Sequence, residues 1–271
     1  MLKRYVLRSK VKLRDVSEEY DVWAAWGSEN EKAWETERQW SRARSGAVEP
    51  VWDYTNDSPW GTEKGVLRDR RASGMGHRLI VRKGEKPKGT ATYDIASPDD
   101  YLLHRILRGV PEGAADIAPM QAFPMDSNLD MMGALDFRKG CYIGQELTVR
   151  TYHTGIIRKR VLPVVIHSPG DASRAPISQL SFPSNLDIKA RVTESSNGAV
   201  RKPRHRATGK LLSSVNGVGL ALLRLEHLPA VENGNIVLEV ETGSAEKQTS
   251  ELTHWLPDWW PPAPALLEQE S

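Results

Sequence analysis

The stretch Lys139-Gly140-Cys141-Tyr142-Ile143-Gly144-Gln145-Glu146 contains the only cysteine of the 271-residue chain. Glycine on either side of Cys141 lets the backbone adopt a positive φ and leaves room beside the sulfur for another molecule. Arg138 and Lys139 place positive charge next to the thiol, which favours the thiolate, the form that ligates metals and attacks electrophiles. A lone cysteine is more often a small buried hydrophobic residue. This setting instead predicts an accessible and reactive sulfur.

The segments on either side extend this pattern. FPMDSNLD lies upstream at residues 123–130, and LTVRTYHTGIIRKRVLP lies downstream at residues 147–163. With these flanks the stretch resembles the YgfZ family, whose members are related to the folate-dependent aminomethyltransferase of the glycine cleavage system and support iron-sulfur cluster assembly. Within the family it is most similar to the mitochondrial, fungal-type assembly factors. The resemblance is specific from about Tyr101 to Arg160, weaker over Leu2–Gly27, and carried near the C-terminus by GKLLSSVNGVGLALLRLE at residues 209–226.

The composition excludes several classes of protein. The 37 basic and 35 acidic residues give a net charge of +2, which argues against a general nucleic-acid coat. One cysteine rules out an internal disulfide framework and a metal site built from cysteines of this chain alone. No apolar run approaches the roughly 20 residues that a membrane-spanning helix needs. We therefore expect neither a nucleic-acid partner nor a membrane partner.

The first part of the chain predicts short strands around a polar segment. Lys10–Arg14 and Tyr20–Trp26 are rich in β-forming residues and are separated by acidic residues, which favours two strands joined by a turn. Residues 28–65 are polar and broken by prolines, so we expect an exposed insertion with a short charged helix over Glu29–Arg44. Leu79–Val81 predicts a further strand.

Helix signals follow. Ser97 can cap a helix that starts with Pro98 and two acids and runs to about Arg108. A second, short helix is expected over Asn128–Gly133. The strand and loop that follow over Leu135–Gly140 would then direct the chain toward the cysteine.

The second part of the chain predicts a β-rich domain. Short strands at regular spacing favour a small barrel, and the tail Trp255–Pro264 is expected to pack as a clamp and then fray. The expected strands are Val161–His167, Ile188–Val192, Lys210–Ser214, Val218–Arg224 and Asn235–Val240.

Together with these expected strands and helices, the resemblance implies an α+β fold with two domains. It implies a partial aminomethyltransferase-like domain of the folate-binding type over residues 1–157, with residues 28–65 as its insertion, and a small antiparallel β-barrel over residues 158–271. It also implies that the chain begins inside the first domain, without the family's N-terminal region or a presequence, and that it acts in the mitochondrial matrix.

The single cysteine constrains the chemistry. An iron-sulfur cluster usually takes four ligands, mostly thiolates, so a cluster at Cys141 must be completed from outside the chain. The resemblance implies an A-type iron-sulfur carrier as the partner, with a shared [2Fe-2S] cluster or a transient complex during [4Fe-4S] maturation. Cys141 would be the metal ligand, and its pocket would be shaped by Lys139, Gly140, Gly144, Gln145 and Glu146. For Gln145 and Glu146 the alternative is a purely structural role.

Nearby polar residues leave alternatives open. His153 could ligate a metal or act as a base for a cysteine nucleophile, but no carboxylate partner is evident, so we assign no catalytic residue and favour an assembly factor over an enzyme. The basic residues Arg150, Arg158, Lys159 and Arg160 form either a solvated strand face or an electropositive rim that attracts an acidic carrier or the glutamate tail of a folate.

Folate chemistry is the rival hypothesis. Folate-binding relatives carry a carboxylate in a segment resembling Arg-Ile-Glu-Ala-Gly, where it pairs with the pterin. Here the matching run is Arg105–Gly109, with Leu107 in the acidic position, so the acceptor for tetrahydrofolate is missing. The alternative function is a folate-dependent one-carbon transferase or a folate-linked redox enzyme. A third possibility is a scaffold without chemistry of its own.

Overall fold

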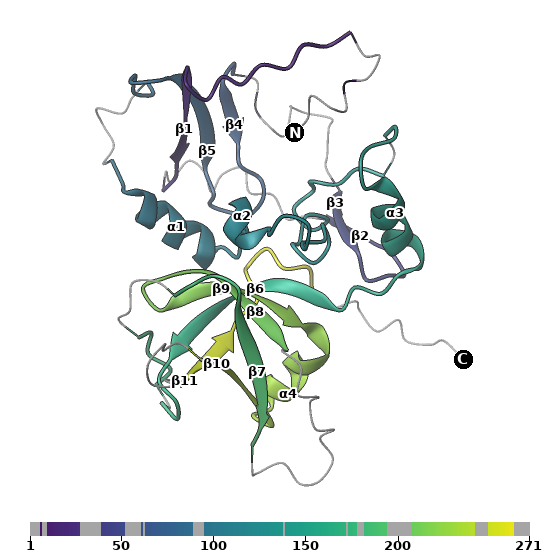
Figure 1. Cartoon of the computed structure of the whole chain (residues 1–271), viewed down its shortest axis with the longest axis vertical. Helices are drawn as coiled ribbons and strands as arrows, with labels where there is room; N and C mark the ends of the chain where they lie inside the picture. The colour runs from purple at the N-terminus through teal and green to yellow at the C-terminus, as the bar shows by residue number, and fades with distance from the viewer. Residues whose placement is uncertain are drawn as a thin grey trace.

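The computed structural model describes residues 6, 10–27, 39–51, 61, 63–88, 95–137, 139–171, 173–177, 182–193, 208–241 and 249–262. Figure 1 shows two halves, with a β-barrel below and a smaller sheet, a hairpin and helices above it. The chain is an α+β protein with a closed antiparallel barrel, as the sequence predicts. Among the described residues, no helix has both the length and the apolar character that crossing a membrane requires.

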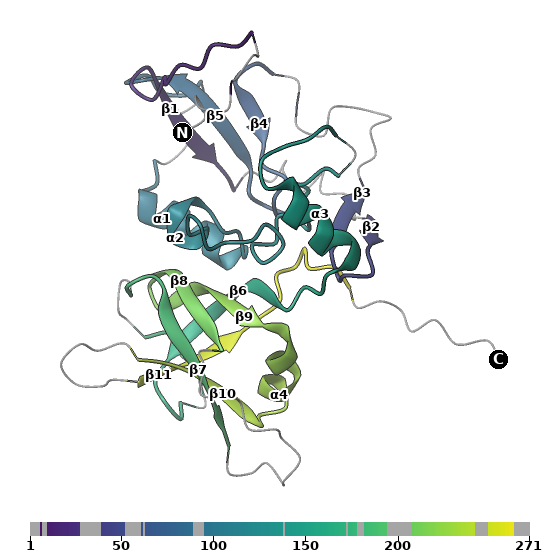
Figure 2. The ribbon, with the colours of Figure 1, turned by 45° about the vertical axis from the view of Figure 1, so that its right-hand side comes forward.

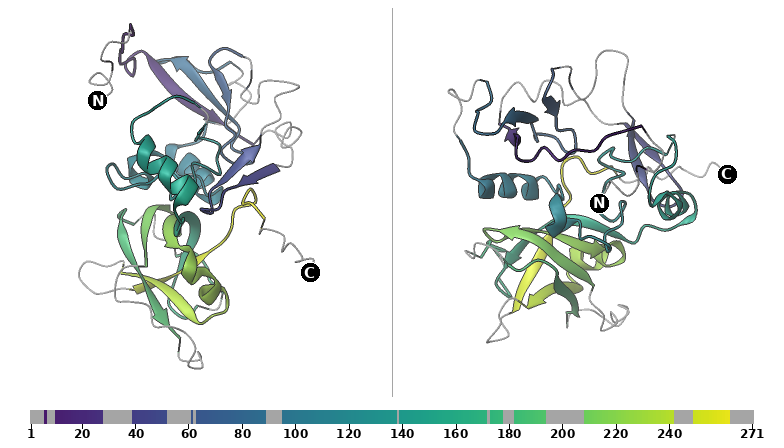
Figure 3. Two further views of the ribbon diagram at one scale, coloured as in Figure 1. Left: turned by 90° about the vertical axis from the view of Figure 1, so that its right-hand side faces the viewer. Right: turned by 45° about the horizontal axis from the view of Figure 1, so that its top comes forward.

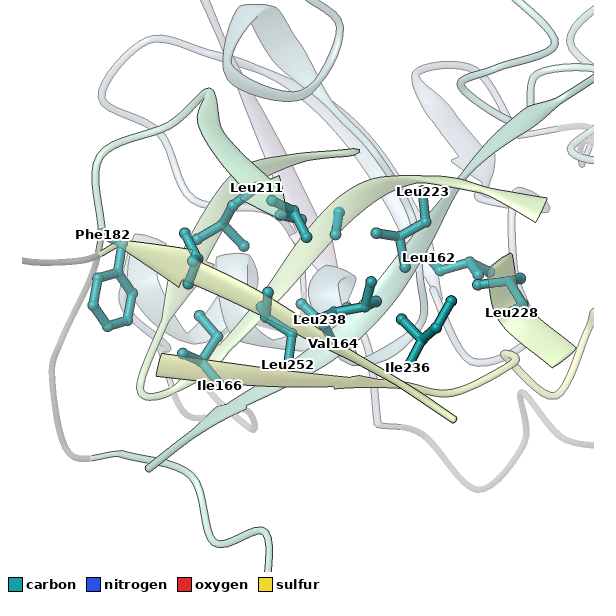
Figure 4. Packing of buried hydrophobic residues seen from close by; sticks show 13 residues of the cluster. Leu162, Val164, Ile166, Phe182, Leu211, Leu223, Leu228, Ile236, Leu238 and Leu252 are labelled. Atoms are coloured by element: carbon teal, nitrogen blue, oxygen red, sulfur yellow. The ribbon is translucent and has the colours of Figure 1, made fainter. Parts of the chain in front are cut away.

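The barrel is closed by antiparallel pairing in the order β10-β11-β6-β9-β8-β7, with β7 returning to β10. Its strands are β6 (Lys159–His167), β7 (Leu186–Val192), β8 (Gly209–Val215), β9 (Val218–Arg224), β10 (Ile236–Glu241) and β11 (Thr249–His254). Alternate side chains of each strand point inward and fill the interior. Figure 4 shows this cluster, in which Leu162, Leu238 and Leu252 come from three different strands. The five predicted barrel strands are all confirmed.

The sixth strand, β11, is not evident in the sequence. Its residues, TSELTH, include a single aliphatic side chain, Leu252, which enters the core. Ser250 and Glu251 are also buried, and Glu251 accepts a hydrogen bond from Arg191 at 3.1 Å. Polar side chains with partners on other strands, such as Thr253 with His167 of the neighbouring β6 and Glu251 with Arg191 of β7, thus replace the usual apolar pattern.

The upper half contains a three-stranded antiparallel sheet in the order β1-β5-β4. The strands are β1 (Tyr20–Ala25), β5 (His77–Arg82) and β4 (Val66–Arg68). β1 and β5 confirm two predicted strands. The predicted strand at Lys10–Arg14 is wrong, because this segment pairs with no described strand and its aliphatic residues Val11 and Leu13 are exposed.

A two-stranded hairpin, β2 (Gln39–Arg42) and β3 (Val48–Val51), lies apart from that sheet. The predicted helix over Glu29–Arg44 is wrong at its C-terminal end, where β2 lies; residues 29–38 are outside the described residues. The exposed character expected for residues 28–65 is also wrong for this hairpin, since Ala47 and Val48 are buried. The hairpin is covered by residues that lie far from it in the sequence, such as Met131 and Ile157.

The described helices are α1 (Pro98–Leu107), α2 (Gly113–Asp116), α3 (Gln145–Thr154) and α4 (Leu228–Glu232), with a 3₁₀ turn, η4, at Leu225–His227. The start of α1 is confirmed in detail: the Ser97 hydroxyl accepts from the Asp100 N–H, and the Asp100 carboxylate accepts from the Ser97 N–H. The predicted helix at Asn128–Gly133 is wrong, because successive tight turns occupy this segment and Asn128 adopts a left-handed φ of 61°. Leu135–Gly140 forms no strand among its described residues.

Contacts from α1 and the tail join the two halves. Ile106 of α1 packs against Val161 and Leu220 of the barrel. Buried Arg105 pairs with Asp116, whose other oxygen accepts from the Ser213 N–H at 3.0 Å. The tail packs as predicted, because the indole N–H of buried Trp259 donates to the Arg108 carbonyl at 2.6 Å, while residues 263–264 lie outside the described residues.

Candidate functional site

Cys141 lies in the loop that leads into α3, and its side chain is exposed. Figure 2 shows this loop rising from the N-terminal end of α3, on the side of the molecule that carries the β2–β3 hairpin. The sulfur is therefore accessible, as the sequence predicts. Arg138, expected beside the thiol, lies outside the described residues.

Residues 145–154 form a helix that the sequence analysis did not predict, and Arg150, for which a strand face was one alternative, lies on it. Threonine and valine are common in strands, so the segment gives no clear helix signal. In α3 the hydroxyls of Thr148, Thr151 and Thr154 each donate to the backbone carbonyl four residues earlier, at 2.9–3.0 Å. These bonds satisfy the hydroxyls within the helix. The spacing of Glu146 and Arg150, which form an ion pair at 2.6 Å, was the signal that could have predicted the helix.

Two reciprocal hydrogen bonds hold the loop after the cysteine. The Gln145 side-chain oxygen accepts from the Tyr142 N–H at 3.3 Å, and the Gln145 N–H donates to the Tyr142 carbonyl at 3.2 Å. Gly144 caps the helix with a left-handed φ of 83°, which favours glycine. The positive φ expected at Gly140 is absent, and an added Cβ there would meet open space. Gln145 thus has an observed structural role in the cysteine loop.

Two other candidate residues have contacts of their own. The Lys139 ammonium lies 4.7 Å from the centre of the Tyr142 ring, a distance typical of a cation–π interaction. Glu146 is exposed and pairs with Arg150 on the outer side of α3. In the sequence of the loop, the Cys141 thiol therefore follows Lys139, whose ammonium contacts the Tyr142 ring, and precedes helix α3, whose first turn contains Glu146.

α3 rests on the β2–β3 hairpin, which lies on its inner side in Figure 1. The Tyr152 hydroxyl donates to Glu49 of β3 at 3.0 Å, and the Tyr152 ring stacks on Phe137 with a centroid distance of 3.9 Å. Ala47 and Ile157 continue this apolar contact in the same buried cluster. The hairpin that the sequence placed in an exposed insertion is therefore the platform of the helix that follows the cysteine.

A buried ion pair anchors this platform to the barrel. Arg160, on β6, donates to both carboxylate oxygens of Asp130, one of them at 2.8 Å, and to the Met125 carbonyl at 2.7 Å. Asp130 also accepts from the Val48 N–H of the hairpin at 3.0 Å. Arg160 is 1% exposed, so its predicted place in a basic surface rim is wrong. Its partner lies thirty positions away, beyond the reach of local sequence patterns.

Titratable groups beside β6 and on α3 form no catalytic arrangement among the residues that the structure describes. Burial raises the pKa of Asp126, although the charges of Lys159 and Arg160 oppose this. His153 is exposed, and its ring meets the Tyr152 ring edge-on with 4.9 Å between centroids. Among the residues that the structure describes, no three His, Cys, Asp or Glu side chains are grouped as a metal site. The described residues near the loop therefore supply one accessible sulfur ligand, the thiol of Cys141.

The Gln145→Ala variant tests the role of Gln145 in holding the loop. It removes the acceptor of the Tyr142 N–H, an interaction worth about 0.5–1.5 kcal/mol. We expect hydrogen exchange at the Tyr142 amide to accelerate by up to about tenfold, while the midpoint of global unfolding changes little. Glu146→Ala is the matched control, because it removes only the surface pair with Arg150. Unchanged exchange at Tyr142 in Gln145→Ala would contradict the assigned role.

Comparison with known proteins agrees with this architecture. Residues 158–262 match the family model described as the CAF17 C-terminal beta-barrel domain. A protein of Cryptococcus neoformans is 44% identical over 241 residues, covering 83% of this chain and 63% of the relative. Proteins of Mycosarcoma maydis (34% over 277 residues; 96% of this chain, 62% of the relative) and Coccidioides immitis (35% over 286 residues; 95% and 61%) are also similar. All three are named mitochondrial iron-sulfur cluster assembly factor IBA57 homologues, and the chain spans just over three fifths of their length.

Proposed function

We propose, from the similarity of most of this chain to these mitochondrial IBA57-type proteins, that it is an iron-sulfur cluster assembly factor acting with an A-type carrier. In this proposal Cys141 supplies one thiolate to a [2Fe-2S] cluster shared with the carrier, or holds a transient complex during [4Fe-4S] maturation. The relatives are named mitochondrial, and this supports a mitochondrial location for the chain. We propose the matrix as its compartment.

The observation that carries the proposal is the exposure of the only thiol of the chain. A cluster usually needs four ligands, so a cluster at this position depends on ligands from a partner. An exposed loop suits such sharing, because the partner's ligands can approach the sulfur from solvent. Sharing also suits transfer, since neither protein alone would hold the cluster firmly.

The other residues of the loop have supporting roles in this proposal. Gln145 and Gly144 fix the loop through the hydrogen bonds to Tyr142 and the left-handed turn. Lys139 places a positive charge next to the loop, where it favours an anionic cluster. Gly140 leaves open space beside the sulfur. Glu146 begins α3 and pairs with Arg150.

Folate-dependent chemistry finds no support in the residues. Leu107, in the position where folate-binding relatives place a carboxylate, is an aliphatic side chain that is half exposed on α1. No acceptor for the donor edge of a pterin stands there. The boundary near residue 157 between an aminomethyltransferase-like domain and the barrel remains a prediction, as does the role of each site residue.

The test of the proposed function is anaerobic reconstitution. The chain is mixed with a recombinant A-type carrier in its apo form, ferrous iron and sulfide, and the mixture is separated by size-exclusion chromatography with detection of the visible absorbance of iron-sulfur clusters. We expect cluster absorbance in a species that contains both proteins, and little on the chain alone. Absorbance that elutes only with the free carrier would overturn the proposal.

A further inference from the structure

Tyr142 is the only residue bonded to Cys141 that has a side chain with which to hold the cysteine in place. The residue on the other side is Gly140, which has none and has the greatest conformational freedom of any residue. An added Cβ at Gly140 would meet open space, so no described atom lies close enough to confine the chain at that position. The place of the sulfur therefore depends mainly on Tyr142.

Tyr142 itself is fixed through its backbone and through its ring. Its N–H donates to the Gln145 side chain at 3.3 Å, and its carbonyl accepts from the Gln145 N–H at 3.2 Å. The ring lies 4.7 Å from the Lys139 ammonium. Between residues 139 and 147, Tyr142 and Gln145 are the two half-buried residues, and the others are exposed. The loop therefore contacts the rest of the protein mainly through this pair.

The contact between Lys139 and Tyr142 spans the cysteine. The two residues lie on either side of Gly140 and Cys141, so the contact closes a short ring of chain that contains the sulfur. The base of the loop is held separately, because the Phe137 ring stacks on Tyr152 of α3. Figure 3 (left) shows α3, drawn in teal on the side that faces the viewer, with the loop that precedes it.

We infer that Tyr142 is a positioning residue for Cys141. Its ring, in contact with the Lys139 ammonium, keeps Gly140 and Cys141 in one arrangement, so that the thiol is presented from a fixed place. This inference deepens the proposed function and rests on it for the use of the sulfur in a shared cluster. A ligand that is ordered before its partner arrives loses less entropy on binding and keeps the required geometry.

A half-buried tyrosine can instead serve only to cover apolar surface. In that case any large apolar side chain would replace it, and Lys139 would not matter. Two substitutions separate these roles. Tyr142→Leu keeps apolar bulk but has no ring face for the ammonium, whereas Tyr142→Phe keeps the ring face. If the ring positions the cysteine, phenylalanine should substitute for Tyr142 and leucine should not.

The experiment attaches a nitroxide label to Cys141, which is the only cysteine of the chain, and records its mobility by electron paramagnetic resonance. In Tyr142→Leu the ratio of mobile to immobile label should rise about two- to fivefold, which corresponds to the loss of an exposed cation–π contact. Tyr142→Phe should retain most of the wild-type spectrum. Lys139→Gln and the double variant Lys139→Gln/Tyr142→Leu should give the same mobile spectrum as Tyr142→Leu, because each breaks the same contact.

The matched control is Tyr20→Leu. The Tyr20 ring lies 5.9 Å from the Arg82 guanidinium on the β1–β5 sheet, so this variant removes the same kind of contact elsewhere. It should leave the label spectrum unchanged. The unfolding midpoint in urea should stay close to that of the wild type in Tyr142→Leu, because the ring contact lies in an exposed loop.

A second readout uses the unlabelled chain and a cluster shared with the A-type carrier. A chelator should remove the cluster about two- to fivefold faster from Tyr142→Leu than from the wild type, and Tyr142→Phe should restore most of its resistance. Unchanged label mobility in Tyr142→Leu would overturn the inference, as would equal mobility in the Leu and Phe variants. If the label follows the expected pattern but the wild type shares no cluster, the proposed function fails and the positioning of Cys141 by Tyr142 stands.

Discussion

The Cys141→Ala variant is expected to lose nearly all of the cluster absorbance that the wild-type chain shares with an A-type carrier. The thiolate is the only cysteine ligand that this chain can supply, and alanine has no atom that could replace it. The loop geometry should survive, because the hydrogen bonds that hold the loop involve Tyr142, Gly144 and Gln145 and not the sulfur. The loss would then report on ligation and not on folding.

Three measurements make this result decisive. Reconstitution with iron and sulfide is followed by absorbance and circular dichroism in the visible region, and iron and sulfide are counted per complex. Carrier binding without a cluster is measured in parallel, where Cys141→Ala should bind like the wild type. Lys139→Gln keeps the ligand and removes only the neighbouring charge, so it should lose a smaller part of the cluster absorbance than Cys141→Ala. Equal cluster content in the wild type and in Cys141→Ala would show that Cys141 is not a ligand.

The sequence predicted elements whose stabilising contacts are local. Helix α1 is stabilised at its start by Ser97 and Asp100, which are three residues apart, and both residues belong to a recognisable capping pattern. Five barrel strands were found because their apolar residues recur at strand spacing. Exposure of Cys141 followed from the small and polar residues around it. In each case the information lies within one short window.

Elements defined by distant partners were missed. The hairpin β2–β3 contains polar residues and a proline, and its burial depends on Asp130, which is 82 positions from Val48. Helix α3 has strand-forming residues, and it is stabilised by hydroxyl bonds within the helix and by the contact of Tyr152 with Glu49. No local pattern predicts that Arg160 is buried, because its burial requires Asp130 and the carbonyls around it.

The Asp130→Asn variant is expected to lose more stability than any of the variants with changes in the cysteine loop or on α3. Breaking a buried ion pair by neutralising one partner costs about 3–5 kcal/mol, because the other charge remains buried without compensation. Both members are almost fully buried, with side-chain exposures of 1% for Arg160 and 0% for Asp130. Asparagine keeps the volume of aspartate, so the effect isolates the charge. Urea unfolding followed by circular dichroism measures the change in the free energy of unfolding.

The consequences should extend from the barrel to the cysteine loop. Asp130 joins β6 to the hairpin through Arg160 and the Val48 N–H, and the hairpin supports α3. In Asp130→Asn, hydrogen exchange in α3 should therefore accelerate more than exchange in β8 and β9, which are held by barrel pairing.

The matched control is Lys83→Gln, which removes one partner of an exposed ion pair with Glu18 and should change stability far less. Replacing both buried partners by apolar residues should recover only part of the loss, because the Val48 N–H would lose its Asp130 acceptor and the Gly46 carbonyl would lose its Arg160 donor. If Asp130→Asn is as stable as the Lys83→Gln control, the buried pair does not anchor the platform, and the support of α3 must come from the Tyr152–Glu49 hydrogen bond and the apolar contacts of Tyr152 and Ala47.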